Sequence, residues 1–179
     1  MIGLNGFFLE RVMIKMGFSD NWVRRIMSCI TSVSFAFKIN GKICGQVIPS
    51  RGLRQGDPIS PYLFIICAEA FSRLIIRGIE RKDVHGIQIC RGAPILSHLF
   101  FADDSILFAK ASVQECSAVA KIISIYERAS GQKVNYDKTE ISFSKGVNHH
   151  LRQEIVDILG VKEVAVSYTH LTLPTKRIV

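Results

Sequence analysis

Residues 99–108 have the sequence Leu-Phe-Phe-Ala-Asp-Asp-Ser-Ile-Leu-Phe. The apolar residues on both sides of the acidic pair predict two strands, over 95–102 and 105–109, joined by a tight turn. Asp103 and Asp104 are therefore expected at the tip of a buried hairpin. Two like charges in a partly desolvated place repel each other, and one carboxylate takes up a proton unless a cation binds there.

A divalent cation is one explanation of this acidic pair. Mg²⁺ binds oxygen ligands at about 2.0–2.1 Å and is commonly held by one or two carboxylates together with substrate phosphates. The alternative is an ordinary hairpin turn, because the short polar side chain of aspartate favours turns. The turn alone does not decide between a metal site and a purely structural turn.

A second segment has the features of a phosphate-binding loop. Residues 50–64 have the sequence Ser-Arg-Gly-Leu-Arg-Gln-Gly-Asp-Pro-Ile-Ser-Pro-Tyr-Leu-Phe, whose Asp-Pro pair predicts a helix start with proline at the first position. Backbone N–H groups and the positive end of a helix favour phosphate. Arg51 and Arg54 can pair with phosphate oxygens, and Gln55 offers both a donor and an acceptor. An ordinary capped loop before a core helix explains the Asp-Pro pair but not the whole segment.

The rest of the chain alternates helical and extended patterns. Apolar spacing and capping residues predict helices over residues 5–17, 19–30, 57–78, 112–131 and 148–160. Asn5 is the expected cap of the first helix, and Ser19 or Asp20 that of the second. Further strands are predicted over residues 32–39, 43–48 and 87–90. Asn40-Gly41 is a strong hairpin-turn signal, and Ser112 and Glu115 have the spacing of a capping box. The fold class is therefore α+β.

Composition sets the remaining limits. The 179 residues are 48% hydrophobic, which is enough for one sizeable core, and one domain is the default expectation. The net charge of +8 suits a polyanionic partner, although a solvated basic face explains it equally well. The five cysteines are widely spaced, which predicts reduced thiols and not a disulfide framework or a zinc site. His149 and His150 are expected in a surface loop.

No membrane segment is predicted. The longest apolar run, residues 62–68, is far shorter than the roughly 20 residues that span a bilayer, and no signal peptide is visible. We therefore expect a soluble, intracellular protein of the nucleus or cytoplasm.

Residues 51–64 and 101–104 together resemble the reverse transcriptases of plant non-LTR (LINE-type) retrotransposons. The spacing between the two segments, the hairpin before them and the sequence Ala-Ser-Gly-Gln-Lys-Val-Asn-Tyr-Asp-Lys-Thr at 129–139 are also similar. The resemblance extends over residues 7–160. The acidic box alone would be a weak pattern, but joined to Arg-Gly-Leu-Arg-Gln-Gly-Asp-Pro-Ile-Ser-Pro at this distance it is highly specific.

The resemblance implies a right-hand polymerase fold, in which residues 1–165 form the palm, a small antiparallel sheet packed on helices, with part of the fingers. It implies an RNA-directed DNA polymerase that adds deoxynucleoside triphosphates to a primer 3′-hydroxyl with two Mg²⁺ (or Mn²⁺) ions. The implied partners are an RNA template and a DNA primer, with no membrane. This interpretation requires the acidic turn and the basic segment to serve one bound nucleotide.

The resemblance also assigns roles to individual residues. Asp103 and Asp104 match the catalytic, metal-binding carboxylates. Lys138 matches a lysine that protonates the leaving pyrophosphate or stabilises its charge, an ordinary surface lysine being the alternative. The residues assigned to nucleotide and template binding are Arg51, Gly52, Arg54, Gln55, Gly56, Ser60, Pro61, Phe101 and Ala102.

The sequence departs from the family in one functional respect. The family has a further metal-binding aspartate on a strand that resembles Lys-Ala-Tyr-Asp-x-Val, whereas no aspartate precedes Asp20 here. We expect a fragment truncated at its N-terminus, without the first part of the fingers, the thumb and the endonuclease of the retroelement polyprotein, and inactive alone. The alternative is a non-catalytic nucleic-acid-binding remnant of a retroelement. Residues 166–179 follow no helical or strand pattern and are expected to be a non-native or disordered tail.

Overall fold

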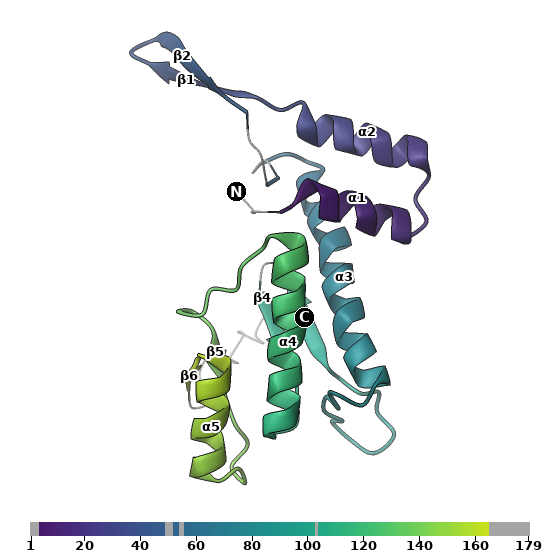
Figure 1. Cartoon of the computed structure of the whole chain (residues 1–179), viewed down its shortest axis with the longest axis vertical. Coiled ribbons are helices and arrows are strands. Elements are labelled where there is room, and N and C mark those ends of the chain that lie inside the picture. Colours follow the sequence, from purple (N-terminus) through teal and green to yellow (C-terminus); the bar gives the residue numbers. More distant parts are fainter. Residues whose placement is uncertain (1–3, 49–51, 54–55, 103, 165–179) are drawn as a thin grey trace, which may run out of the picture. The chain divides into compact units, whose positions relative to one another are not determined.

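The computed structural model describes residues 4–48, 52–53, 56–102 and 104–164. The chain divides into two compact units, and Figure 1 labels the elements of both. Unit 1 comprises Met1–Glu80 and Lys121–Lys133, and unit 2 comprises Arg81–Ala120 and Val134–Val179. Helix α4 (Val113–Ser130) contributes its first part to unit 2 and its second part to unit 1.

Unit 1 is mainly helical, and capping side chains mark the starts of its first two helices. Its complete helices are α1 (Gly6–Lys15), α2 (Asp20–Thr31) and α3 (Ser60–Glu80). The side chain of Asn5 accepts a 3.0 Å hydrogen bond from the Phe7 amide, and Ser19 Oγ accepts one of 3.4 Å from Trp22. Each cap satisfies an N–H group that the first helical turn leaves without a partner. The predicted starts of α1 and α2 are thus confirmed.

The hydrophobic core of unit 1 lies among these three helices. Its buried residues are Leu4, Leu9, Met13, Val23, Ile26, Leu53, Leu63 and Cys67. Each large apolar side chain that is fully buried stabilises the fold by about 1.5–3 kcal/mol. Burial also raises the pKa of the Cys67 thiol to about 12, so Cys67 stays protonated and packs as a small apolar residue.

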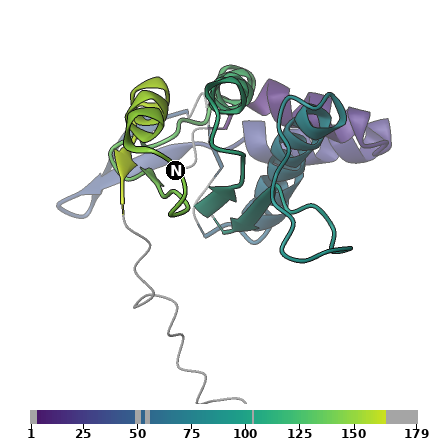
Figure 2. The ribbon, with the colours of Figure 1, turned by 90° about the horizontal axis from the view of Figure 1, so that it is seen from below.

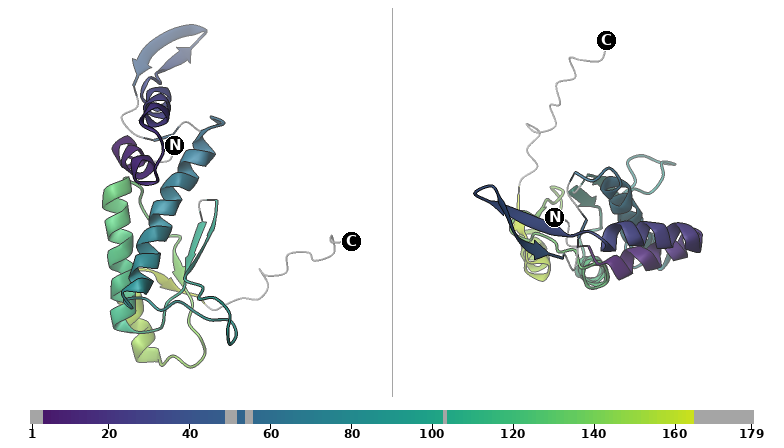
Figure 3. Two further views of the ribbon diagram at one scale, coloured as in Figure 1. Left: turned by 90° about the vertical axis from the view of Figure 1, so that its right-hand side faces the viewer. Right: turned by 90° about the horizontal axis from the view of Figure 1, so that it is seen from above.

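A hairpin extends from the helices of unit 1, as Figures 1 and 3 show. Strands β1 (Phe35–Ile39) and β2 (Lys42–Val47) pair in antiparallel fashion around the predicted turn, in which Asn40 and Gly41 have φ angles of 49° and 82°. Both positive φ angles belong to the type I′ turn that matches strand twist. The register shifts between Ala36 and Phe37, opposite Gly45, whose φ is 71°. Gly45 is thus the extra residue of a β-bulge.

Unit 2 holds two further strand pairs and a capped helix. Its remaining elements are β3 (His98–Phe101), β4 (Asp104–Leu107), β5 (Glu140–Ile141), α5 (His149–Leu159) and β6 (Lys162–Glu163). Strands β3 and β4 are antiparallel and β5 and β6 are parallel. Helix α5 lies beside the β5–β6 pair in Figures 1 and 2. Asn148 caps its start, and Gly160 ends it with φ 64°.

The mixed composition of helices and strands agrees with the predicted α+β class, but several boundaries differ. In place of one small antiparallel sheet, the described residues form three separate two-stranded pairs. Helix α3 begins at Ser60, because Asp57 Oδ1 accepts the Ile59 amide at 3.0 Å and forms a turn before the helix. Gly78 does not end α3 but is buried inside it. His149 and His150 begin α5 and are not in a loop.

The strand predicted over residues 87–90 is wrong. Only Ile87 pairs, through two 2.8 Å backbone hydrogen bonds with Leu96. The chain then turns, because the Ala93 amide donates to the Cys90 carbonyl and Gly92 has a φ of 84°. A turn this close leaves no room for a longer strand.

Two observations concern the cysteines and the helices within the part of the chain that the structure describes. All five cysteines are free thiols, and Cys67 and Cys116 are buried. None of the described helices combines the length and the hydrophobicity that are needed to cross a lipid bilayer.

Candidate active-site residues

The acidic turn is a two-residue hairpin loop in unit 2. Phe101 pairs with Asp104, so Ala102 and Asp103 connect the two strands. Asp103 lies outside the described residues. Ala102 has a φ of 52°, which is the left-handed region that a residue with a Cβ atom occupies at a cost of about 1–2 kcal/mol. The tight turn therefore stores strain next to the acidic pair.

The sequence predicted a buried hairpin, but the hairpin is exposed. Leu99, Phe101 and Ile106 are 48%, 81% and 55% exposed. Leu99 and Ile106 are direct cross-strand partners, and Phe101 follows Leu99 by two residues, so the three side chains lie on one face of the pair. Two paired strands form a single layer, and this face of the layer is open to solvent.

Asp104 provides one candidate metal ligand. It is the first residue of β4, and its side chain is exposed, so a carboxylate oxygen is accessible to a hard cation. The described residues contain no cluster of three or more His, Cys, Asp or Glu side chains that could hold an ion. A metal at this turn would therefore need Asp103 and oxygen ligands from outside this set.

The basic segment belongs to unit 1 and is described only in part. Arg51, Arg54 and Gln55 lie outside the described residues. Gly52 donates its amide to the Leu4 carbonyl at 3.0 Å and has a φ of 94°, and Gly56 is exposed with a φ of 85°. Both glycines thus occupy a backbone conformation that other residues rarely adopt. Between them, Leu53 is buried in the core and anchors the segment.

The segment also lines a small cavity. The cavity of about 20 Å³ is bounded by Gly52, Leu53, Asp57 and Ser60, together with residues of α2 and β1. This volume holds about one water molecule, so it is not a nucleotide pocket. Ser60 begins α3 and Pro61 follows it with an exposed side chain.

Lys138 lies in a turn of unit 2. Its amide donates to the Asn135 carbonyl at 3.1 Å, and its side chain is exposed. The structure thus groups Gly52, Gly56, Ser60 and Pro61 within unit 1, and Phe101, Ala102, Asp104 and Lys138 within unit 2. The metal-binding and nucleotide-binding roles of these residues stay predictions.

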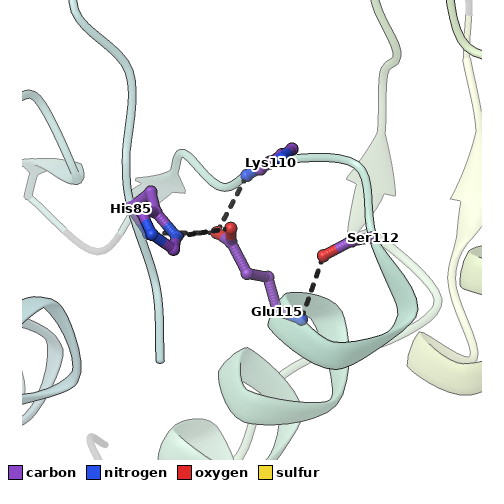
Figure 4. Close-up of polar contacts among 4 residues, drawn as sticks. All are labelled: His85, Lys110, Ser112 and Glu115. Carbon is purple, nitrogen blue, oxygen red and sulfur yellow. Dashed lines mark hydrogen bonds and ion pairs between the residues drawn. The ribbon is translucent and has the colours of Figure 1, made fainter. Parts of the chain in front are cut away.

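A polar cluster that the sequence did not predict lies at the start of α4 (Figure 4). The "Glu115 cluster" consists of Glu115, His85, Lys110 and Ser112. Glu115 Oε2 accepts 3.0 Å hydrogen bonds from the backbone amides of His85 and Lys110, and Oε1 lies 2.7 Å from His85 Nδ1. The Glu115 side chain is 6% exposed. Such a carboxylate is stable because hydrogen bonds replace its lost water.

Only one of the two hydrogen bonds of the predicted capping box is present in this cluster. The Ser112 hydroxyl accepts from the Glu115 amide at 3.3 Å, as the pattern requires. The carboxylate, however, binds His85 and Lys110 and does not return to the Ser112 amide. Burial on its own would raise the pKa of Glu115, but the amides of His85 and Lys110 and the His85 ring outweigh it, and the pKa is lowered.

Comparison with known proteins gives a consistent result. Residues 8–163 match the family described as reverse transcriptase (RNA-dependent DNA polymerase). An uncharacterized mitochondrial protein of Arabidopsis thaliana is 54% identical over 69 residues, which cover 38% of this chain and 57% of that protein. The retrovirus-related Pol polyprotein from the type-1 retrotransposable element R2 of Popillia japonica is 29% identical over 129 residues, or 72% of this chain and 20% of the polyprotein.

A third similar protein comes from a vertebrate. The transposon TX1 uncharacterized 149 kDa protein of Xenopus laevis is 28% identical over 127 residues, which cover 68% of this chain and 9% of that protein. The chain therefore spans little more than half of the mitochondrial relative and a fifth or less of the two retroelement proteins.

The strained turn makes a testable prediction. The substitution Ala102→Gly removes the Cβ atom that opposes a positive φ, and we expect it to raise the free energy of unfolding by about 1 kcal/mol. Ala36→Gly is the control, because Ala36 lies in strand β1 and glycine weakens an extended segment. Denaturant unfolding of both variants and the wild type measures the difference. A lower stability of Ala102→Gly would contradict the strain.

The lowered pKa of Glu115 predicts a pH dependence. A carboxyl group with a depressed folded-state pKa stabilises the fold fully above its unfolded value of about 4.5, and the contribution is lost as the pH falls below that value. We expect the stability difference between wild type and Glu115→Gln to be largest near neutral pH and to shrink below pH 4.5. Urea titrations at several pH values measure it, and a difference that stays constant would refute the prediction.

Proposed function

The chain belongs to the reverse transcriptase (RNA-dependent DNA polymerase) family, and we propose that it is the palm, with part of the fingers, of a retroelement polymerase. By lineage it is an RNA-directed DNA polymerase with a partial non-LTR reverse transcriptase domain. In the proposed reaction the parent protein adds deoxynucleotides to a primer 3′-hydroxyl on an RNA template. Residues 1–165 are proposed as the polymerase part and residues 166–179 as unrelated to it.

One observation carries the proposal. Within a chain that matches the family over residues 8–163, Asp104 directly follows a two-residue turn and presents an exposed carboxylate at the first position of β4. A carboxylate in this place is accessible to a hydrated cation and to phosphate oxygens that share it. The strained backbone of Ala102 supports a functional reason for the turn, because strain of this kind is concentrated at active sites.

We propose that Asp103 and Asp104 hold two Mg²⁺ or Mn²⁺ ions. Carboxylate oxygens are the hard ligands that these ions prefer, and the donor set therefore fits them. When bound, such ions lower the pKa of a primer hydroxyl and neutralise charge on a triphosphate. The task of the two aspartates is to bind and orient these ions.

The remaining proposed roles concern the substrate. Arg51 and Arg54 pair with phosphate oxygens, and Gly52 and Gly56 allow the backbone to approach the nucleotide, which their positive φ angles support. Gln55 hydrogen-bonds the nucleotide or template. The other proposed contacts with nucleotide or template come from Ser60, Pro61, Phe101 and Ala102. Lys138 is proposed to protonate or neutralise the leaving pyrophosphate, and its exposed side chain is free to reach a ligand.

A non-catalytic nucleic-acid-binding module is the second candidate. The net charge of +8 favours it, because basic side chains near phosphates release condensed counterions whether or not catalysis follows. The two candidates differ in their dependence on the aspartates. Binding that Asp103→Asn leaves unchanged, in a chain without polymerase activity, favours the second.

The incomplete carboxylate set gives the first prediction of activity. The resemblance implies three metal-binding aspartates, and the 179 residues supply two of them, so we expect the isolated chain not to extend a DNA primer on an RNA template with Mg²⁺. Gel analysis of a labelled primer measures extension. The variant Asp104→Asn sets the background, and extension by the wild type above that background would contradict the prediction.

The basic segment gives a second prediction. Replacing Arg51 and Arg54 with alanine should make the slope of log affinity against log salt for a primer–template duplex less negative by about 2, since each phosphate contact contributes about 0.9. The matched control replaces Arg24 and Arg25, which are exposed on α2. Fluorescence anisotropy at several salt concentrations measures both slopes. Equal changes in the two variants would mean that only overall charge matters.

A further inference from the structure

The carboxylate of Glu115 bridges the chain segments on either side of the β3–β4 hairpin. The His85 amide, which donates to Oε2 at 3.0 Å, lies before the hairpin, and the Lys110 amide, at the same distance from the same oxygen, lies after it. Glu115 itself is in the first turn of α4. One buried side chain thus holds both ends of the segment that carries Asp104.

Backbone hydrogen bonds connect these anchor points to the strands. After His85, Ile87 and Leu96 exchange two hydrogen bonds of 2.8 Å, and Leu96 leads into β3. Before Lys110, the Phe108 amide donates to the Ser97 carbonyl at 2.8 Å and continues the β3–β4 pairing beyond the strands. Short stretches of chain and these hydrogen bonds therefore connect Glu115 to the hairpin on both sides.

One face of the hairpin is open to solvent. Leu99, Phe101 and Ile106 are largely exposed, so burial of their side chains contributes little to its position. Two-stranded hairpins are at best marginally stable on their own. The Glu115 cluster provides a buried polar anchor at the base of the hairpin.

We propose that Glu115 is a positioning residue that holds the β3–β4 turn, and with it the candidate metal ligand Asp104, against the start of α4. The inference rests on the proposed function for the metal, but the hold on the hairpin stands on geometry alone. Glu115 touches neither substrate nor metal in this role. It acts through the backbone of residues 85–87 and 108–110.

The substitution Glu115→Gln tests the hold on the hairpin. It keeps the shape but removes the charge, and a neutral amide oxygen is a weaker acceptor for the N–H groups of His85 and Lys110. Glu154→Gln is the matched control, because Glu154 is an exposed glutamate on α5 in the same unit. Both are compared with the wild type as full chains.

Amide hydrogen exchange, measured by NMR, is the first readout. For Glu115→Gln we expect exchange at Ile87, Leu96 and Phe108 to become about tenfold faster than in the control, because hydrogen bonds to a charged group are the stronger kind. Amides of α5, such as that of Gly160, should not change. Equal acceleration in α5, or no acceleration at the three hairpin amides, would overturn the proposal.

Binding of Mn²⁺ is the second readout, because a purely structural role of Glu115 would leave the affinity for Mn²⁺ unchanged. Mn²⁺ broadens the NMR signals of nearby amides, and Ser105 follows Asp104 directly. We expect Glu115→Gln to raise the Mn²⁺ concentration for half-maximal broadening at Ser105 by about tenfold, the lower end of the effect of removing groups that orient metal ligands. An unchanged Mn²⁺ concentration in a variant with faster hairpin exchange would overturn the positioning of Asp104.

The two readouts separate this inference from the proposed function. If Mn²⁺ does not broaden Ser105 in the wild type, the metal site fails, and selective exchange at the hairpin still supports the hold by Glu115. If Glu115→Gln does not fold, His85→Ala decides, because the His85 side chain is 60% exposed and its loss spares both backbone amides. We expect about threefold faster exchange at the same three amides in that variant, and an unchanged rate would overturn the proposal.

Discussion

A buried carboxylate persists in a protein only where hydrogen bonds replace the water that it has lost, and this constraint shapes unit 2. Glu115 meets it with two backbone amides and a histidine ring. Because backbone amides cannot move without the chain, the segments that hold them are fixed as well. The Glu115 carboxylate thereby joins the start of α4, the segment before β3 and the segment after β4. The core of unit 1 depends instead on apolar packing among α1, α2 and α3.

Features that depend on neighbouring residues were predictable from the sequence. The turn at Asn40-Gly41 and the caps at Asn5 and Ser19 follow from side chains that act within three positions of themselves. Features that depend on distant residues were not. His85 and Glu115 are 30 positions apart, and the Ser112–Glu115 spacing pointed to a reciprocal cap that the carboxylate does not make.

The candidate site was also predictable only where local sequence decides. The motif around the acidic pair indicated the family, and the match over residues 8–163 confirms it. The apolar flanks of that pair suggested burial, but hydrophobicity alone does not tell whether a second layer covers a strand, and Leu99 and Phe101 are exposed. Lys138 and the glycines of the basic segment have positions in the structure, whereas their chemistry depends on ligands that only a bound state supplies.

The bulge in the β1–β2 hairpin has a consequence for how the protein behaves among its own copies. Phe37, Ile39 and Ile43 are exposed on this hairpin, and an extended apolar strand with open edges invites another chain to pair with it. The extra residue, Gly45, breaks the regular spacing of N–H and C=O groups along β2. An incoming strand would lose register at that point, so the bulge opposes pairing of another chain along the edge of β2.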